Sequence, residues 1–156
     1  MKKYGLIGTT LTHSFSVKYF NDKFQKENLT ECQYQNYSLA SISEFKGLFE
    51  RESLLGVNVT IPYKESIIPY LDRLSKEAKD IGAVNCVKLE GGELVGYNTD
   101  SFGFKNSLQP LLKDKTLKAL ILGSGGASKS VRHALNELGI EYQFVSRKGS
   151  FSYHNL

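Results

Sequence analysis

The stretch Leu54-Leu55-Gly56-Val57-Asn58-Val59-Thr60-Ile61-Pro62-Tyr63-Lys64 leads from an apolar run into a group of polar side chains. Residues 55–60 predict a buried β-strand, and Pro62 ends it because proline has no N–H to donate to a sheet. Asn58, Thr60 and Lys64 therefore lie where a strand ends, which is where open α/β sheets bind ligands. The alternative is a strand, a turn and a solvated lysine that opens the next helix.

The composition limits the classes of protein to which this chain can belong. At 156 residues it can hold one domain, or one domain and part of another. The net charge of +4 is spread along the chain without a block of five like charges, so nucleic-acid binding is not indicated. No apolar run is long enough for a membrane span or a signal peptide. We expect a cytoplasmic protein without a membrane or nucleic-acid partner.

Cysteine and histidine give no sign of a metal site. Cys32 and Cys86 are far apart, and the three histidines are scattered without the spacing of metal ligands. We therefore expect two reduced thiols and no bound metal.

Strand and helix patterns alternate along the first hundred residues, which predicts a three-layer α/β/α domain with a mostly parallel sheet and an antiparallel edge. Glu90-Gly91-Gly92-Glu93 predicts the turn of a hairpin. Strands are expected at 4–8, 33–38, 55–60, 82–89 and 94–97, and helical segments at 16–28, 42–49, 67–71 and 73–80.

A second structural unit is expected after a helix over residues 99–112, where Pro110 and the polar residues 113–115 indicate a boundary. A strand at 117–122, a helix to about residue 138 and a strand at 142–146 form one βαβ unit. A complete dinucleotide-binding fold has about six strands. We therefore expect domains at 1–98 and 117–156 with a linker helix at 99–116, the second domain being the truncated start of a Rossmann-like fold.

The turn Gly123-Ser124-Gly125-Gly126-Ala127-Ser128 follows a strand and opens a helix, as a phosphate-binding turn requires. Gly123 permits the tight turn, and Gly125 lets a pyrophosphate approach the backbone. Ser128, at the place of the third glycine, is small enough for close packing. The free N–H groups of the helix end favour an anion. A tight βα turn without a ligand is the alternative.

The residues after the next strand bear on the choice of dinucleotide. NAD-binding folds carry an acidic residue about 20 positions after the glycine turn. This chain instead has Ser146, Arg147 and Lys148, whose hydroxyl and cations suit a 2′-phosphate. We expect NADP rather than NAD, the alternative being two solvated basic residues.

Two further polar turns allow a structural or a functional interpretation. Ser14 and Ser16 precede the first helix, where they can cap it or hold a substrate carboxylate. Asn98 or Thr99 can cap the linker helix, with Asp100 favourable in its first turn. Alternatively, Asp100 faces Lys64 across a cleft and the two act as a unit.

Together these segments resemble the shikimate dehydrogenase family. The resemblance lies in six segments in the family's order and spacing: Ser14-x-Ser16, Asn58-Val-Thr-x-Pro-x-Lys64, Gly82-Ala83-Val84-Asn85, Gly96-x-Asn98-Thr99-Asp100, Gly103-Phe104 and Gly123-x-Gly125-Gly126-Ala127-Ser128. It implies NADPH-dependent reduction of 3-dehydroshikimate to shikimate, on the route to chorismate and the aromatic amino acids. Residues 1–98 would then bind shikimate, and 117–156 would begin the NADP-binding domain.

The resemblance also implies roles for individual residues. Lys64 would donate and accept the proton at the reacting oxygen, paired with Asp100, and hydride delivery to a ketone does build alkoxide charge that an ammonium can stabilise and protonate. Ser14 and Ser16 would hold the substrate carboxylate. The ring hydroxyls would be bound by Asn58, Thr60, Asn85 and Asp100, with support from Thr99. NADP would contact Gly123, Gly125, Gly126, Ala127, Ser128, Ser146 and Arg147.

The chain also departs from the family's pattern. Thr10 and Val17 stand where members commonly carry prolines, and this chain lacks the tyrosine and the glutamine that the family uses from a later segment. Two alternatives therefore stay open: a shikimate-binding module without catalysis, and a dehydrogenase that acts on quinate and accepts NAD. We expect a chain that ends early to expose apolar surface, and therefore either to self-associate, for example as a homodimer, or to have a poorly ordered C-terminal region.

Overall fold

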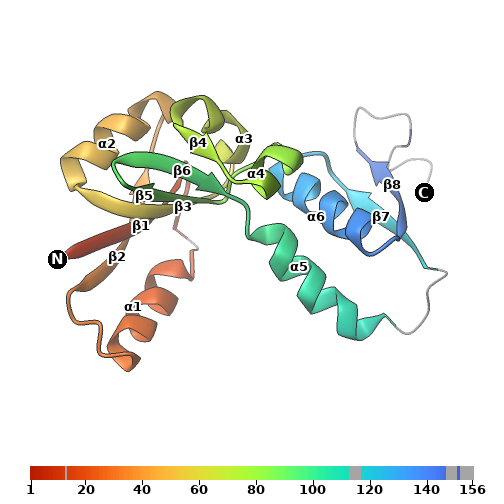
Figure 1. The fold of residues 1–156 in the computed structure, drawn as a ribbon, viewed down its shortest axis with the longest axis horizontal. Helices are drawn as coiled ribbons and strands as arrows, with labels where there is room; N and C mark the ends of the chain where they lie inside the picture. The colour runs from red at the N-terminus through yellow and green to blue at the C-terminus, as the bar shows by residue number, and fades with distance from the viewer. Residues whose placement is uncertain (13, 113–116, 147–150, 152–156) are drawn as a thin grey trace.

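A computed structural model describes residues 1–12, 14–112, 117–146 and 151 as two β-sheets joined by a helix (Figure 1). The larger sheet has six strands in the order β2-β1-β3-β5-β6-β4. Its strands are β1 (Lys2–Gly8), β2 (Cys32–Ser38), β3 (Leu54–Val59), β4 (Arg73–Leu74), β5 (Cys86–Glu90) and β6 (Glu93–Tyr97). This mixed α/β architecture with a mostly parallel sheet is the predicted fold class.

The strand directions confirm the predicted hairpin, but the hairpin does not lie at the edge of the sheet as expected. β1 runs parallel to β2 and β3, whereas β5 is antiparallel to both of its neighbours, β3 and β6. Gly91 and Gly92 form the hairpin turn with φ angles of 59° and 89°, which glycine adopts without a Cβ clash. β4 pairs in parallel outside β6, so the hairpin lies one strand inside the edge.

The helix predicted over residues 73–80 was wrong in its first part. Arg73 and Leu74 are extended and pair with Val95 and Gly96 of β6. Helix α4 (Lys76–Ile81) begins only after Ser75, whose hydroxyl accepts a hydrogen bond from the Ala78 N–H at 3.1 Å. The strand predicted over 82–89 likewise begins later, at Cys86, because residues 82–85 form a loop.

Helices cover both faces of the larger sheet. α1 (Ser16–Lys26) lies on one face, and α2 (Phe45–Glu52) and α3 (Tyr63–Ser66) lie on the other (Figure 1). Two short 3₁₀ turns, η1 (Ile42–Glu44) and η2 (Ile68–Tyr70), flank them. The predicted three-layer arrangement of this half is therefore present.

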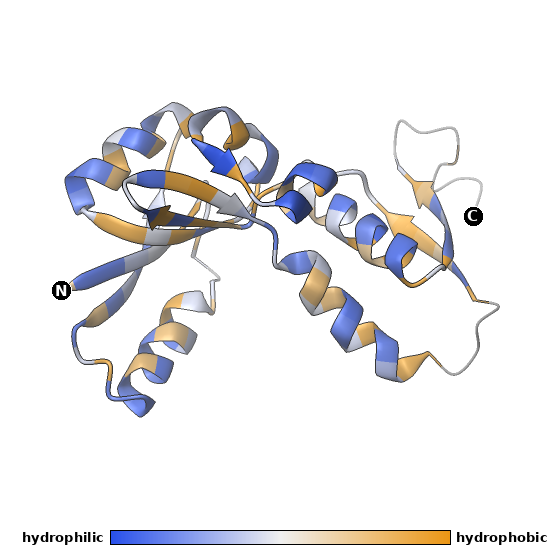
Figure 2. Cartoon of the chain, in the orientation of Figure 1, coloured by the Kyte–Doolittle hydropathy of each residue, from blue (hydrophilic) through white to orange (hydrophobic). Residues whose placement is uncertain are grey.

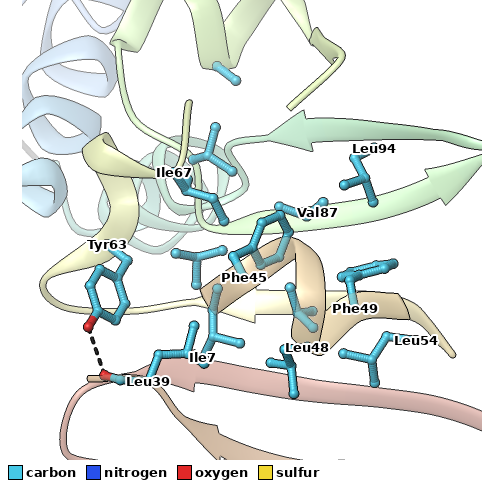
Figure 3. Packing of buried hydrophobic residues seen from close by; sticks show 14 residues of the cluster. Ile7, Leu39, Phe45, Leu48, Phe49, Leu54, Tyr63, Ile67, Val87 and Leu94 are labelled. Carbon is cyan, nitrogen blue, oxygen red and sulfur yellow. Dashed lines mark hydrogen bonds between the residues drawn. The ribbon is translucent and has the colours of Figure 1, made fainter. Parts of the chain in front are cut away.

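The main core lies between the sheet and α2 (Figure 3). Phe45, Ile7 and Leu54 are at most 1% exposed, and the Phe45 ring meets Phe49 edge-on at 5.5 Å between centroids. The buried Tyr63 donates its hydroxyl hydrogen to the Leu39 carbonyl at 2.7 Å. Because Tyr63 immediately precedes Lys64, the core fixes the backbone that presents this lysine.

The second half contains the predicted βαβ unit. α5 (Asp100–Leu108) and η3 (Gln109–Leu111) lead to β7 (Lys118–Leu122), α6 (Gly126–Glu137) and β8 (Glu141–Val145), and β7 and β8 are parallel. β7 is mostly hydrophobic, whereas β8 is hydrophobic only toward its end (Figure 2). Leu120 and Leu122 of β7 are nevertheless 54% and 61% exposed. The predicted apolar surface is therefore present, whereas self-association stays a prediction.

A buried polar junction joins the two halves. The Asn98 amide donates to the Ala83 carbonyl and to the Ser130 hydroxyl of α6, both at 2.9 Å. Its oxygen accepts the Ser101 N–H at 3.2 Å, so of the two predicted capping residues it is the Asn98 side chain that bonds to the start of α5, while Thr99 occupies the cap position without a side-chain bond. Asn98 and Ser130 are 6% and 1% exposed, and unpaired groups at this depth would be costly. The contact therefore fixes how α6 meets the larger sheet.

Candidate active site

Lys64 and Asp100 meet at the junction of the two halves. The turn after β3 places Lys64 at the start of α3, and the end of β6 places Asp100 as the first residue of α5. Lys64 Nζ lies 2.7 Å from Asp100 Oδ2, and the two side chains are 16% and 34% exposed. This is a short, partly buried, charge-assisted hydrogen bond. The structure thus brings together the two residues expected to face each other, and their catalytic roles stay a prediction.

Asn85 fixes the second oxygen of the Asp100 carboxylate. Its amide nitrogen donates to Asp100 Oδ1 at 2.7 Å and to Thr99 Oγ1 at 2.9 Å. Its amide oxygen accepts the backbone N–H of Thr99 at 2.8 Å. Asn85 is only 8% exposed, so these bonds hold its side chain in one orientation. Both carboxylate oxygens of Asp100 are therefore held, one by Asn85 and one by Lys64.

Asn58 and Thr60 belong to the neighbouring strand end. Asn58 Oδ1 accepts the hydroxyl hydrogen of Tyr34 at 2.7 Å, and Asn58 Nδ2 lies 3.5 Å from the Asn85 carbonyl oxygen. Thr60 directly follows β3, and its N–H donates to the Ile7 carbonyl at 2.9 Å. Sequence reasoning missed Tyr34. The available signal was a tyrosine within a predicted strand, because a buried phenol requires a hydrogen-bond partner.

The serine turn lies at the start of α1. Ser14 Oγ accepts the Ser16 backbone N–H at 3.2 Å, so Ser14 has the predicted capping function at the start of this helix. Phe15 occupies the formal cap position and makes no side-chain bond there. The first N–H groups of a helix otherwise lack partners and carry a partial positive charge. This setting suits a carboxylate, although binding of a carboxylate by Ser14 and Ser16 stays a prediction.

The glycine turn between β7 and α6 has the conformation that its sequence predicts. Gly123 has a φ of 108°, which a residue with a Cβ rarely adopts. A Cβ placed on Gly125 would meet no atom within 4 Å, so the backbone there is open to a ligand. Ala127 and Ser128 follow in the first turn of α6. The Gly123 N–H donates to the Val145 carbonyl at 2.8 Å, which brings the end of β8 and Ser146 beside the turn. Arg147 lies outside the described residues.

Gly126 connects the glycine turn to Lys64. A Cβ on Gly126 would lie 3.0 Å from Lys64 Cβ, closer than most carbon contacts, and in ordinary contact with Ala83 Cβ at 3.6 Å. Lys129 of α6 also pairs with Glu65, the residue after Lys64. The candidate cofactor turn and the candidate catalytic lysine are therefore in direct contact.

This contact predicts different effects for two neighbouring glycines. Gly126→Ala should weaken binding of shikimate, the substrate that the resemblance implies, about twofold to tenfold, because repacking against a crowded site costs on the order of 1 kcal/mol and displaces Lys64. Gly125→Ala should leave that binding unchanged and weaken binding of NADP⁺, the expected dinucleotide, because its Cβ enters the open space beside the glycine turn. Calorimetric titration of both variants with each ligand checks this. Equal shikimate affinity in the two variants would contradict the Gly126 contact.

A separate apolar hollow of about 480 Å³ lies on the face of the sheet that carries α1. Tyr34, Asn58 and Cys86 line one part of it, but Lys64 and Asp100 do not line it. Burial raises the pKa of the Cys86 thiol, which keeps it protonated near neutral pH.

Among the described residues, no group of three or more histidine, cysteine or acidic side chains could hold a metal ion. In the same part of the chain, no helix is long and apolar enough to cross a membrane.

Comparison with known proteins identifies the family. Residues 6–87 match the family described as the shikimate dehydrogenase substrate binding domain, which is more than half of the chain. The chain belongs to this family. The NADP(+) shikimate dehydrogenase of Clostridium beijerinckii is 44% identical over 155 residues, covering 95% of this chain and 56% of the relative. The chain therefore spans about half the length of the curated relatives that it matches.

Solved structures of shikimate dehydrogenases share the fold. The enzyme from Peptoclostridium difficile superposes with a TM-score of 0.91 at 40% identity, covering 99% of this chain and 61% of the other. The enzyme from Thermus thermophilus, solved in complex with NADP(H) and shikimate, gives a TM-score of 0.82 at 34% identity, covering 95% and 57%. The similarity extends beyond residues 6–87 into the second half of this chain.

Proposed function

We propose that this chain forms the substrate side and the start of the cofactor side of an NADP-dependent shikimate dehydrogenase. The reaction is reduction of 3-dehydroshikimate to shikimate, on the route to chorismate and the aromatic amino acids. The observation that carries the proposal is the network of Lys64, Asp100 and Asn85, held against the glycine turn at Gly126. This network supports a role for Lys64 as proton donor beside a candidate dinucleotide site.

The chemistry follows from the charge of the network. NADPH, when bound, supplies the hydride. Negative charge then develops on the substrate oxygen, and the Lys64 ammonium stabilises that oxygen and donates a proton to it. Asp100 holds the ammonium in place at 2.7 Å, while Asn85 keeps the carboxylate oriented. In the reverse direction, Lys64 accepts the proton from the hydroxyl of shikimate.

The remaining polar residues suit the rest of the substrate. Ser14 and Ser16, at the N-terminus of α1, would bind the carboxylate. Asn58, Thr60, Asn85 and Asp100 would bind the ring hydroxyls, with Thr99 supporting Asn85 through the hydrogen bond between their side chains. Residues 1–98 would thus form the shikimate-binding domain and 99–116 the linker.

The glycine turn fits a dinucleotide phosphate. Gly123 makes the tight turn, Gly125 leaves the backbone open, and Gly126, Ala127 and Ser128 begin a helix of 12 residues whose N-terminus attracts anions. Ser146 and Arg147 would bind the 2′-phosphate that distinguishes NADP. We include 117–156 in the proposal as the start of the NADP-binding domain.

Homodimer formation through the exposed apolar side of β7 is part of the same proposal and is tested by sedimentation.

The simplest test of this proposal is a turnover assay on a chimera. In this chimera, the present chain replaces the matched part of the Clostridium beijerinckii relative. We expect NADPH to form from shikimate and NADP⁺, at a higher rate than with quinate or NAD⁺. A folded chimera that binds NADP⁺ but does not turn over shikimate would contradict the proposed enzyme. If the chain alone then binds shikimate but not NADP⁺, it is a binding module. Preference for quinate with NAD⁺ would favour the quinate alternative.

A further inference from the structure

Tyr34 is a buried residue of the edge strand β2 to which the proposed mechanism gives no role. It is 3% exposed. Its ring stacks on Phe20 of α1, with 4.5 Å between the centroids and an interplanar angle of 16°. This packing fixes the orientation of the phenol ring, and a buried hydroxyl needs a hydrogen-bond partner close to it.

The backbone of Tyr34 is tied to α1 by a single side chain. The Asn21 amide nitrogen donates to the Tyr34 carbonyl at 2.9 Å, and the Asn21 oxygen accepts the Tyr34 N–H at 3.0 Å. Both bonds satisfy backbone groups of an edge strand that would otherwise lack partners in the sheet. Because α1 begins at Ser16, this pair fixes the serine turn relative to Tyr34.

The hydroxyl of Tyr34 holds the oxygen of the Asn58 amide. It donates to Asn58 Oδ1 at 2.7 Å, and with the oxygen engaged by the phenol the amide nitrogen is the group left to donate elsewhere. Asn58 Nδ2 has only a long contact of 3.5 Å to the Asn85 carbonyl, so it retains donor capacity. Burial raises the pKa of Tyr34, partly offset by the Ser16 side chain, and the phenol therefore stays protonated.

We propose that Tyr34 is a positioning residue for substrate binding. It locks the Asn58 amide with Nδ2 available as a donor to a ligand oxygen, and it joins the start of α1 to the end of β3. The inference rests on the proposed function, in which that oxygen belongs to a ring hydroxyl of shikimate. In this role Tyr34 acts through Asn58: it does not contact the ligand itself, and it orients the amide so that Asn58 presents a hydrogen-bond donor.

Calorimetric titration of this chain with shikimate tests the proposal. Tyr34→Phe keeps the stacked ring and removes the hydroxyl, so we expect shikimate affinity to fall about threefold to tenfold, as for loss of one net hydrogen bond. Tyr37→Phe, on the same strand, is the control. The Tyr37 hydroxyl is buried and has no hydrogen-bond partner among the described residues, so its removal should leave the affinity unchanged.

A double-mutant cycle separates positioning from a general structural effect. In an Asn58→Ala background, Tyr34→Phe should change shikimate affinity by less than about twofold, because the group that it positions is gone. The Asn58 side-chain amide signals in a ¹⁵N–¹H spectrum should also shift in Tyr34→Phe and stay in place in Tyr37→Phe.

Three outcomes would overturn the role of Tyr34: wild-type affinity in Tyr34→Phe, the same loss with and without Asn58, or unchanged Asn58 amide signals. A chain that binds no shikimate would instead refute the proposed function. The amide signals would then still decide whether Tyr34 positions Asn58.

Discussion

Replacement of Lys64 by methionine is expected to lower the rate of NADPH formation from shikimate by about 10² to 10⁴ in the chimera, the range for a positioned acid–base group. Methionine keeps an unbranched apolar stem in the contact with Gly126 but has no proton to donate or accept. The Asp100 carboxylate keeps its bond to Asn85, so the pocket should stay assembled. Initial rates at saturating shikimate and NADP⁺ measure the effect on turnover.

The same substitution should change shikimate affinity far less than turnover. In this chain alone, we expect Lys64→Met to change shikimate affinity by less than about tenfold, because one polar contact among several is lost. Lys105→Met is the matched control, since Lys105 pairs with Glu137 on the outer side of α5 and α6 and exposed pairs contribute little. Wild-type turnover in Lys64→Met would rule out its role as the proton donor.

Asp100→Asn should produce the second large effect, a fall in turnover of about a hundredfold, at the low end of that range. The substitution keeps the shape of the side chain and removes the charge that holds Lys64 Nζ at 2.7 Å. An amide has a single acceptor oxygen, so either Asn85 Nδ2 or Lys64 Nζ then faces an NH₂ group in place of an acceptor. Initial rates and shikimate affinity should therefore both decrease.

Asp72→Asn provides a control with the same change of charge. Asp72 Oδ2 accepts the Leu94 N–H at 2.7 Å, away from Lys64, so its replacement should cost about 1 kcal/mol of stability and leave turnover unchanged. If Asp100→Asn were as active as Asp72→Asn, the ion pair would have a structural role and no catalytic one.

Local sequence signals predicted the elements that have strong local patterns. The hairpin at Gly91 and Gly92, the glycine turn at Gly123 and the parallel pair of β7 and β8 all follow from turn chemistry and periodicity. Strand β4 was missed because two residues are too few to show a period of two. Its pairing depends on β6, and nothing in the sequence of β6 indicates a partner 22 residues earlier.

The sequence predicted which residues of the candidate site follow the ends of strands, but it could not predict which of these residues contact one another. Lys64 and Asp100 each followed a predicted strand, and only the sheet order brings them to 2.7 Å. The contact of Gly126 with Lys64 depends on how α6 meets the larger sheet, which the buried pair of Asn98 and Ser130 sets. Tyr34 was missed because its partner lies 24 positions away on another strand.

The most direct test of the proposed site is a ¹⁵N–¹H titration of this chain with shikimate. We predict that the backbone amides that shift most lie in the serine turn at Ser14 and Ser16, at 58–60, at Asn85 and at 99–100. Signals of β7 and β8 should change little. Shifts confined to the apolar hollow beside Phe24 and Leu29, or no shifts at saturating shikimate, would contradict the proposed site.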